Sequence, residues 1–200
     1  MTRKTRIALK AIAWIFFLTP VAILALNAAT GKLGADPAAS IAASTGLEAI
    51  WLLAITLAIT PVRRLIPALG WLIQFRRLTG LFAFFYATLH MATYVALFSG
   101  FDVATMLDDV TKRRFILAGV ITWLLLLTLA VTSTQWAIRK LGGKRWNLLH
   151  KLTYLAALAA LIHFWWKVKP GVLSPVPITA VLVLLLAARP VMGWVKRKAN

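Results

Sequence analysis

The stretch KRWNLLHKLTYLAALAALIHFWW, residues 144–166, has the length of a single membrane-spanning helix. It opens with basic residues, continues almost without charge and closes on aromatic residues, and it carries His150 near its start and His163 near its end. An ionisable side chain inside a hydrophobic span is costly and therefore indicates function by default. Together with His90, which lies in another apolar stretch, the two histidines predict a metal or haem site inside a bundle of membrane helices.

The composition of the whole chain is that of an integral membrane protein. Of its 200 residues, 61% are hydrophobic and only 14% are charged, and several apolar runs are about 20 residues long. The chain has no cysteine, which excludes disulfides, iron–sulfur clusters and covalently attached haem. Any haem must therefore be held by histidines and packing alone, as a b-type haem is.

The net charge of +18 comes from basic clusters that lie between the apolar runs. Basic loops beside membrane helices are typical of the cytoplasmic face, and they also attract anionic lipid headgroups. We therefore expect these charges to face the lipid bilayer, and we expect no nucleic-acid partner.

The apolar runs predict an all-α fold, a bundle of six transmembrane helices that forms a single transmembrane domain over residues 1–200. The first run resembles a signal peptide, but its length favours an uncleaved helix. Segments rich in Gly, Pro and Asp, notably residues 27–46 and 99–114, predict loops. We find no convincing internal repeat. The predicted spans are approximately residues 7–26, 47–66, 78–98, 115–133, 146–166 and 178–194.

The distribution of charge predicts the orientation of this bundle. Six spans place both termini on one side, and that side, with its two connecting loops, holds 17 of the 23 Lys and Arg residues. The other face holds the remaining six, including Lys169, and all five acidic residues. Because positive residues gather on the cytoplasmic side, we expect the N- and C-termini to be cytoplasmic.

The spacing of the histidines predicts their depth in the membrane. His90 follows Arg77 by 13 residues and His163 follows His150 by 13 residues, which is about 20 Å of helical rise in each case. His90 and His163 are therefore expected at one depth in the outer half of the bilayer, where two imidazoles can clamp a haem iron. His150 lies near the inner face, where the facing level of span three carries Arg76 and Arg77, which are not ordinary iron ligands.

The histidines also have other interpretations. Thirteen residues rotate a helix by roughly 140° beyond whole turns, so His150 and His163 need not face one cleft. Membrane histidines can simply bond a neighbouring helix or relay protons, and a different metal is a further alternative. A zinc or iron catalytic site is disfavoured because the spans lack Cys and Asp. The only buried carboxylate candidate is Glu48, at the outer edge of span two, which disfavours a proton pump.

Several short motifs, taken in order along the chain, resemble those of the MsrQ (formerly YedZ) family of haem-bearing membrane subunits. No single motif is decisive, but together they cover essentially the whole chain. They are LGADP (residues 33–37), RRLTGL (76–81), ATLH (87–90), TSTQ (132–135), KRWNLLHKLTY (144–154) and IHFWW (162–166).

The resemblance implies a ferric-reductase-like transmembrane fold in the bacterial inner membrane, with one or two b-type haems and an associated flavin mononucleotide (FMN). It implies that electrons come from the quinone pool or from a cytosolic flavin reductase. They pass to a periplasmic molybdopterin enzyme that reduces methionine sulfoxide in proteins, so the chain itself would have no sulfoxide-reducing site. The family's haem histidines fall on His90 and His163, as the outer pair, and on His150, as a candidate ligand of a second haem.

Two other functions are alternatives to this electron-transfer subunit. The first is a standalone ferric or quinone reductase of the same fold, although no nucleotide-binding GxGxxG motif is present. The second is a non-redox transporter or assembly factor with structural histidines. Basic residues at the inner face are expected to anchor the bundle or to bind a flavin phosphate or haem propionates, and acidic residues of the outer loops to form a docking face. The basic residues are Arg76, Arg77, Lys144 and Arg145; the acidic residues are Asp36, Asp102, Asp108 and Asp109.

Overall fold

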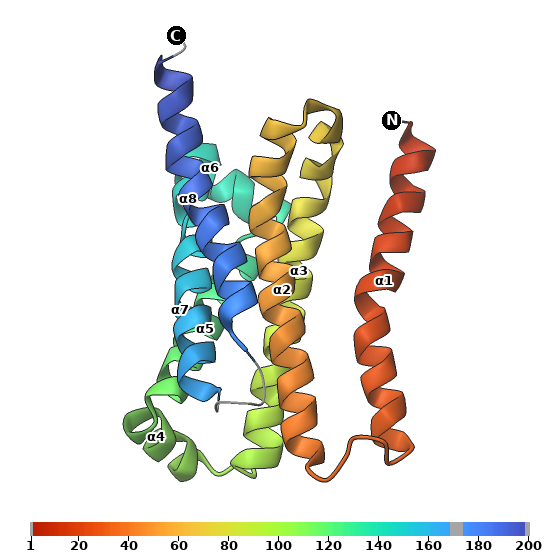
Figure 1. The fold of residues 1–200 in the computed structure, drawn as a ribbon, viewed down its shortest axis with the longest axis vertical. Coiled ribbons are helices and arrows are strands. Elements are labelled where there is room, and N and C mark those ends of the chain that lie inside the picture. The colour runs from red at the N-terminus through yellow and green to blue at the C-terminus, as the bar shows by residue number, and fades with distance from the viewer. Residues whose placement is uncertain (1, 169–173, 199–200) are drawn as a thin grey trace.

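The computed structural model describes residues 2–168 and 174–198, with side chains as far as residue 188. Lys169, which the charge count above assigns to the outer face, lies outside the described residues. The described chain folds into helices, of which η1 is a 3₁₀ helix and η2 a π-helix (Figure 1). The elements are α1 (Arg3–Ala29), α2 (Pro37–Leu65), η1 (Pro67–Phe75), α3 (Arg76–Thr93), η2 (Tyr94–Phe98), α4 (Val103–Lys112), α5 (Arg114–Val131), α6 (Gln135–Leu149), α7 (Leu152–Lys167) and α8 (Val176–Lys198).

Four stretches are long and apolar enough to cross a membrane: α1, α2, the stretch Pro67–Phe98 and α5. The pair α6 and α7 passes the same test as one span with a bend of 47°. The apolar part of α8, Val176–Ala188, is shorter than a full span. Residues 2–168 and 174–198 therefore contain four or five candidate spans, and the sixth span stays a prediction.

The loop predicted over residues 27–46 is only about a third as long as expected, because α1 continues to Ala29 and α2 begins at Pro37. The Asp36 carboxylate caps this helix by accepting a hydrogen bond of 2.9 Å from the Ala39 amide. Proline is favoured in the first helical turn and aspartate at the cap. The same two residue types are typical of turns, which is why their helix-start signal was missed.

The second predicted loop, residues 99–114, is also mostly helical. Asp102 caps α4 by accepting hydrogen bonds from the amides of Ala104 (3.0 Å) and Thr105 (3.2 Å). The pKa of the exposed Asp102 carboxyl is lowered mainly by a hydrogen bond from the Thr105 hydroxyl, and further by the hydrogen bonds from the two amides. The acidic residue thus starts a short helix outside the spans.

The predicted fifth span, residues 146–166, is not one helix. Its inner end belongs to α6, and the chain turns at His150 and Lys151 before α7 begins. Within α6, Gly142 has a φ of 73°, which places a kink in the helix. Glycine permits this left-handed conformation at no steric cost. The single straight helix expected over residues 146–166 was wrong, because hydrophobicity does not report the bend of 47° between α6 and α7.

The core of the bundle lies where α2 packs on α3 and α5 packs on α7, with α8 against α2 (Figure 1). Small residues at these contacts let helices approach closely, as they do in membrane bundles generally. The most deeply buried members of the core are Leu57, Ala83, Tyr86, Ala156, Ala157 and Leu182.

Helix α1 stands at the side of the bundle (Figure 1), and a hydroxyl from the core holds it there. Tyr86 of α3 donates a hydrogen bond of 2.6 Å to the Phe17 carbonyl and accepts one of 3.2 Å from the Val21 amide. Pro20 lies between these two positions and has no amide hydrogen to offer. The tyrosine therefore inserts into the backbone ladder of α1 beside its proline.

Candidate functional site

The rings of His90 and His163 face each other inside the bundle. His90 comes from α3 and His163 from α7, and their ring centroids lie 5.8 Å apart with the ring planes at 82°. Both side chains are partly buried. The two histidines that spacing places at one depth therefore meet in the fold.

Backbone carbonyls fix the orientation of both rings. His90 Nδ1 lies 2.8 Å from the Ala42 carbonyl oxygen, and His163 Nδ1 lies 2.7 Å from that of Phe115. Because a carbonyl can only accept, each Nδ1 carries the hydrogen and donates it. Each Nε2 of the neutral ring then keeps a free lone pair, which is the arrangement of a metal-binding histidine. Within the described chain, no protein group bonds to either Nε2.

A glycine packs against each of these rings. A Cβ atom added at Gly46 of α2 would lie 3.1 Å from His90 Nδ1, and one added at Gly119 of α5 would lie 2.9 Å from His163 Nδ1. Both distances are shorter than ordinary carbon contacts. Any side chain at these positions would push the ring away from its carbonyl, so the two glycines belong to the site.

The two halves of the site are copies of one arrangement. In each, the histidine follows its carbonyl partner by 48 residues, and the glycine lies four residues after that carbonyl. Equivalent positions are 73 residues apart: 42 and 115, 46 and 119, 90 and 163. The pairs α2–α3 and α5–α7 thus form an internal duplication that is not apparent in the sequence. It was missed because so few positions in each copy carry it.

The spacing of the pair fits a haem iron held between two imidazoles. With ring centroids 5.8 Å apart and each Nε2 free, His90 and His163 could both bind one metal ion placed between them. The described residues contain no cluster of three or more His, Cys, Asp or Glu side chains that could hold a metal ion. The donors that the structure brings together here are the two imidazoles.

His150 occupies a different place, at the corner between α6 and α7. Its ring stacks on Trp146 with centroids 3.9 Å apart, and its Nε2 lies 3.3 Å from the Thr132 hydroxyl. That hydroxyl donates to the Thr128 carbonyl at 2.6 Å, so it accepts from His150. The Trp146 indole in turn donates to the Thr132 carbonyl at 2.8 Å. Protein groups therefore hold this ring, and it does not join the other two.

With this geometry established, comparison with known proteins identifies the class of fold. The family model described as "Ferric reductase like transmembrane component" matches residues 40–161. This region covers α2 to most of α7 and contains His90 and His150, whereas His163 lies just beyond its end.

Curated relatives narrow the family further. The chain is 43% identical over 194 residues to "Protein-methionine-sulfoxide reductase heme-binding subunit MsrQ" of Herminiimonas arsenicoxydans, covering 96% of this chain and 88% of the relative. Proteins of the same name from Ralstonia nicotianae and Xanthomonas axonopodis pv. citri are 40% and 42% identical, covering 96% and 100% of this chain and 88% and 92% of the relatives. The chain belongs to the MsrQ family within the ferric-reductase-like transmembrane proteins. The resemblance seen in the sequence motifs is confirmed, and the chain is a multi-pass membrane protein.

Proposed function

We propose that this protein is the b-type haem-bearing electron-transfer subunit of a methionine sulfoxide reductase system, and that His90 and His163 would hold one haem by its iron. The observation that carries the proposal is the opposed pair of rings, each with Nδ1 bonded to a carbonyl and Nε2 free. The relatives' printed name, a heme-binding subunit, supports the same cofactor.

The residues of this chain would tune the cofactor and position it. A bound haem supplies one-electron chemistry. Donation from Nδ1 to the Ala42 and Phe115 carbonyls raises the basicity of each imidazole and fixes its tautomer. Gly46 and Gly119 leave room for the rings in that orientation. The surrounding helices keep water out, which together with axial ligand identity sets the potential.

The proposal includes the predicted topology, with six spans, one domain over residues 1–200 and both termini in the cytoplasm. Helix α1 begins and α8 ends at one end of the bundle, while the α1–α2 connection and α4 lie at the opposite end (Figure 1). His90 bonds to Ala42, close to the start of α2. The pair therefore lies nearer the face proposed as outer, from which electrons would reach a periplasmic molybdopterin reductase.

The remaining parts of the proposal follow from the family. We propose electron supply from the quinone pool or a cytosolic flavin reductase, with FMN as an associated cofactor. His150 is the candidate ligand of a second haem, although its contacts with Thr132 and Trp146 equally support a structural role. A standalone ferric or quinone reductase of the same fold is the alternative function.

Reduced-minus-oxidised absorption spectra, with haem counted per protein, test the proposal. We expect a b-type spectrum in the wild type and its loss in both His90→Ala and His163→Ala. The His150→Ala variant reports independently whether a second haem is bound. A colourless wild type, after expression with sufficient haem, would overturn the proposal and favour structural or transport roles for the histidines.

A further inference from the structure

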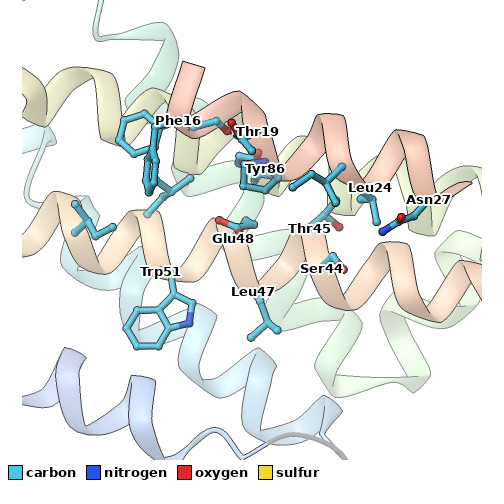
Figure 2. A pocket seen from close by; sticks show the side chains of 15 residues that line it. Phe16, Thr19, Leu24, Asn27, Ser44, Thr45, Leu47, Glu48, Trp51 and Tyr86 are labelled. Carbon is cyan, nitrogen blue, oxygen red and sulfur yellow. Dashed lines mark hydrogen bonds between the residues drawn. The ribbon is translucent and has the colours of Figure 1, made fainter. Parts of the chain in front are cut away.

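A cavity of about 710 Å³ lies between α1, α2 and α3 (Figure 2). Its wall is mostly apolar, with contributions from Phe16 and Phe17 of α1. Polar groups are few and include Glu48 of α2 and Tyr86 of α3, whose side chains Figure 2 shows in the space between α1 and α2. A cavity of this size with a few polar groups is typical of a site for a small organic molecule.

Glu48 is the residue of this cavity that most strongly indicates a bound ligand. No hydrogen bond or ion pair from the described part of the chain reaches its carboxylate, and the residue is only partly buried. It lies 11 residues after Pro37, about 16 Å along α2, which is inside the candidate membrane span that α2 forms. An unpaired carboxylate in the hydrocarbon is costly and marks a functional site by default.

The cavity shares a wall with His90. Thr45 lines the cavity and is buried, and its hydroxyl lies 2.7 Å from the Ile41 carbonyl and 3.3 Å from the Ala42 carbonyl. The Ala42 carbonyl is the group that accepts from His90 Nδ1. Tyr86, on the same wall, precedes His90 by one helical turn. A molecule in the cavity would therefore lie within one layer of side chains of the proposed haem ligand.

We propose that the cavity binds a membrane-dissolved hydroquinone, with a ring hydroxyl donating a hydrogen bond to the Glu48 carboxylate. The ligand must reach the site through lipid, fit an apolar wall and offer a hydrogen-bond donor at hydrocarbon depth. A phospholipid headgroup lies too high for this, and an acyl chain has no donor. This inference rests on the proposed function, in which a haem accepts the electrons. It assigns a binding site to the quinol that would supply them.

The redox step balances with groups already named. Oxidation of one hydroquinone to its quinone breaks two O–H bonds and releases two electrons and two protons. A haem held by His90 and His163, beyond the shared wall, would accept these electrons one at a time, so that one hydroquinone would reduce two equivalents of ferric haem. The Glu48 carboxylate takes the first proton. The second would leave to water at the end of the cavity near Asn27 and Ser44, which lie in the last turn of α1 and in the N-terminal part of α2.

Photolabelling tests binding without relying on electron transfer. The full-length protein in lipid nanodiscs is irradiated without oxygen in the presence of an azido-hydroquinone, the reduced form that carries the ring hydroxyls, and labelled peptides are identified by mass spectrometry. We expect labels on α1 and α2 around the cavity, several-fold fewer in Glu48→Gln and in the cavity-filling Leu24→Trp, and retention in Glu48→Asp. Leu184→Trp, on an exposed position of α8, is the size control and should leave labelling unchanged.

Haem reduction by decylubiquinol, compared with reduction by dithionite, separates this inference from the proposed function. In Glu48→Gln we expect about tenfold more decylubiquinol for half-maximal reduction, because a charge-assisted hydrogen bond is lost, with unchanged dithionite reduction. Two results would overturn the hydroquinone site. The first is labelling at positions away from the cavity. The second is labelling and reduction in Glu48→Gln and Leu24→Trp that equal those of the wild type. Absence of haem would instead contradict the proposed function. The labelling result would still decide whether the cavity binds the hydroquinone.

Discussion

At the scale of single residues, the neighbours of each histidine decide which of its ring nitrogens is free to bind a metal. His90 and His163 each donate from Nδ1 to a carbonyl of an adjacent helix, which leaves Nε2 free. His150 instead lies against Trp146 and the Thr132 hydroxyl. His150 thus differs in chemistry from the other two histidines because its neighbours differ.

The two glycines beside the rings give a prediction at this scale. We expect Gly46→Ala and Gly119→Ala to lower haem affinity by about 10–100-fold, the range for lost outer-shell support. The effect should be larger at Gly119, where the added Cβ would lie 2.9 Å from the ring against 3.1 Å at Gly46. Haem retained per protein after gel filtration measures the change.

Gly70→Ala is the matched control, because a Cβ there would meet nothing within 4 Å. It should keep the haem content of the wild type. Full haem occupancy in both Gly46→Ala and Gly119→Ala would contradict the role that we assign to the two glycines.

The sequence allowed the histidines to be chosen and their shared depth to be predicted, because helical rise is constant along a span. It did not allow Gly46, Gly119 or the carbonyls of Ala42 and Phe115 to be found. These groups act through contacts between helices, and a carbonyl is present at every residue. The only signal in the sequence was the constant separation of 73 residues between equivalent positions of the two helix pairs, and too few positions share it to be noticed.

At the scale of elements, apolar length predicted where helices run and failed where they begin or bend. The first four predicted spans fall on α1, α2, Pro67–Phe98 and α5. Asp36 and Asp102, read as loop formers, start α2 and α4 instead. The acids proposed as a docking face therefore already have structural roles, since Asp109 also pairs with Arg113 at 3.0 Å.

The kink inside α6 at Gly142 gives a prediction at this scale. We expect Gly142→Ala to lower the free energy of unfolding by about 1–2 kcal/mol, because a side chain at φ 73° is strained. Gly143→Ala should raise the free energy of unfolding by about 0.5 kcal/mol, because a Cβ at Gly143 meets no other atom and the φ of Gly143 is not positive. Thermal unfolding in detergent measures both. Equal effects of the two substitutions would show that the left-handed conformation at Gly142 is not needed for the kink in α6.

At the scale of the whole molecule, the duplicated helix pairs explain how a chain with three histidines builds a two-ligand site. Each pair, α2–α3 or α5–α7, provides one histidine, one carbonyl and one glycine. Their packing closes the site between them. Composition and charge predicted the membrane class, and the family comparison confirmed it. The proposed orientation and the sixth span depend on the bilayer and on basic residues near the C-terminus, whose side chains lie beyond those described.

Electron paramagnetic resonance of the oxidised protein tests the central claim most directly, because the signal of ferric haem reports its axial ligands. We expect a low-spin signal in the wild type and in His150→Ala, and its conversion to high spin, or its loss with the haem, in His90→Ala and in His163→Ala. A wild-type low-spin signal that survives unchanged in either of the latter variants would contradict ligation by this pair.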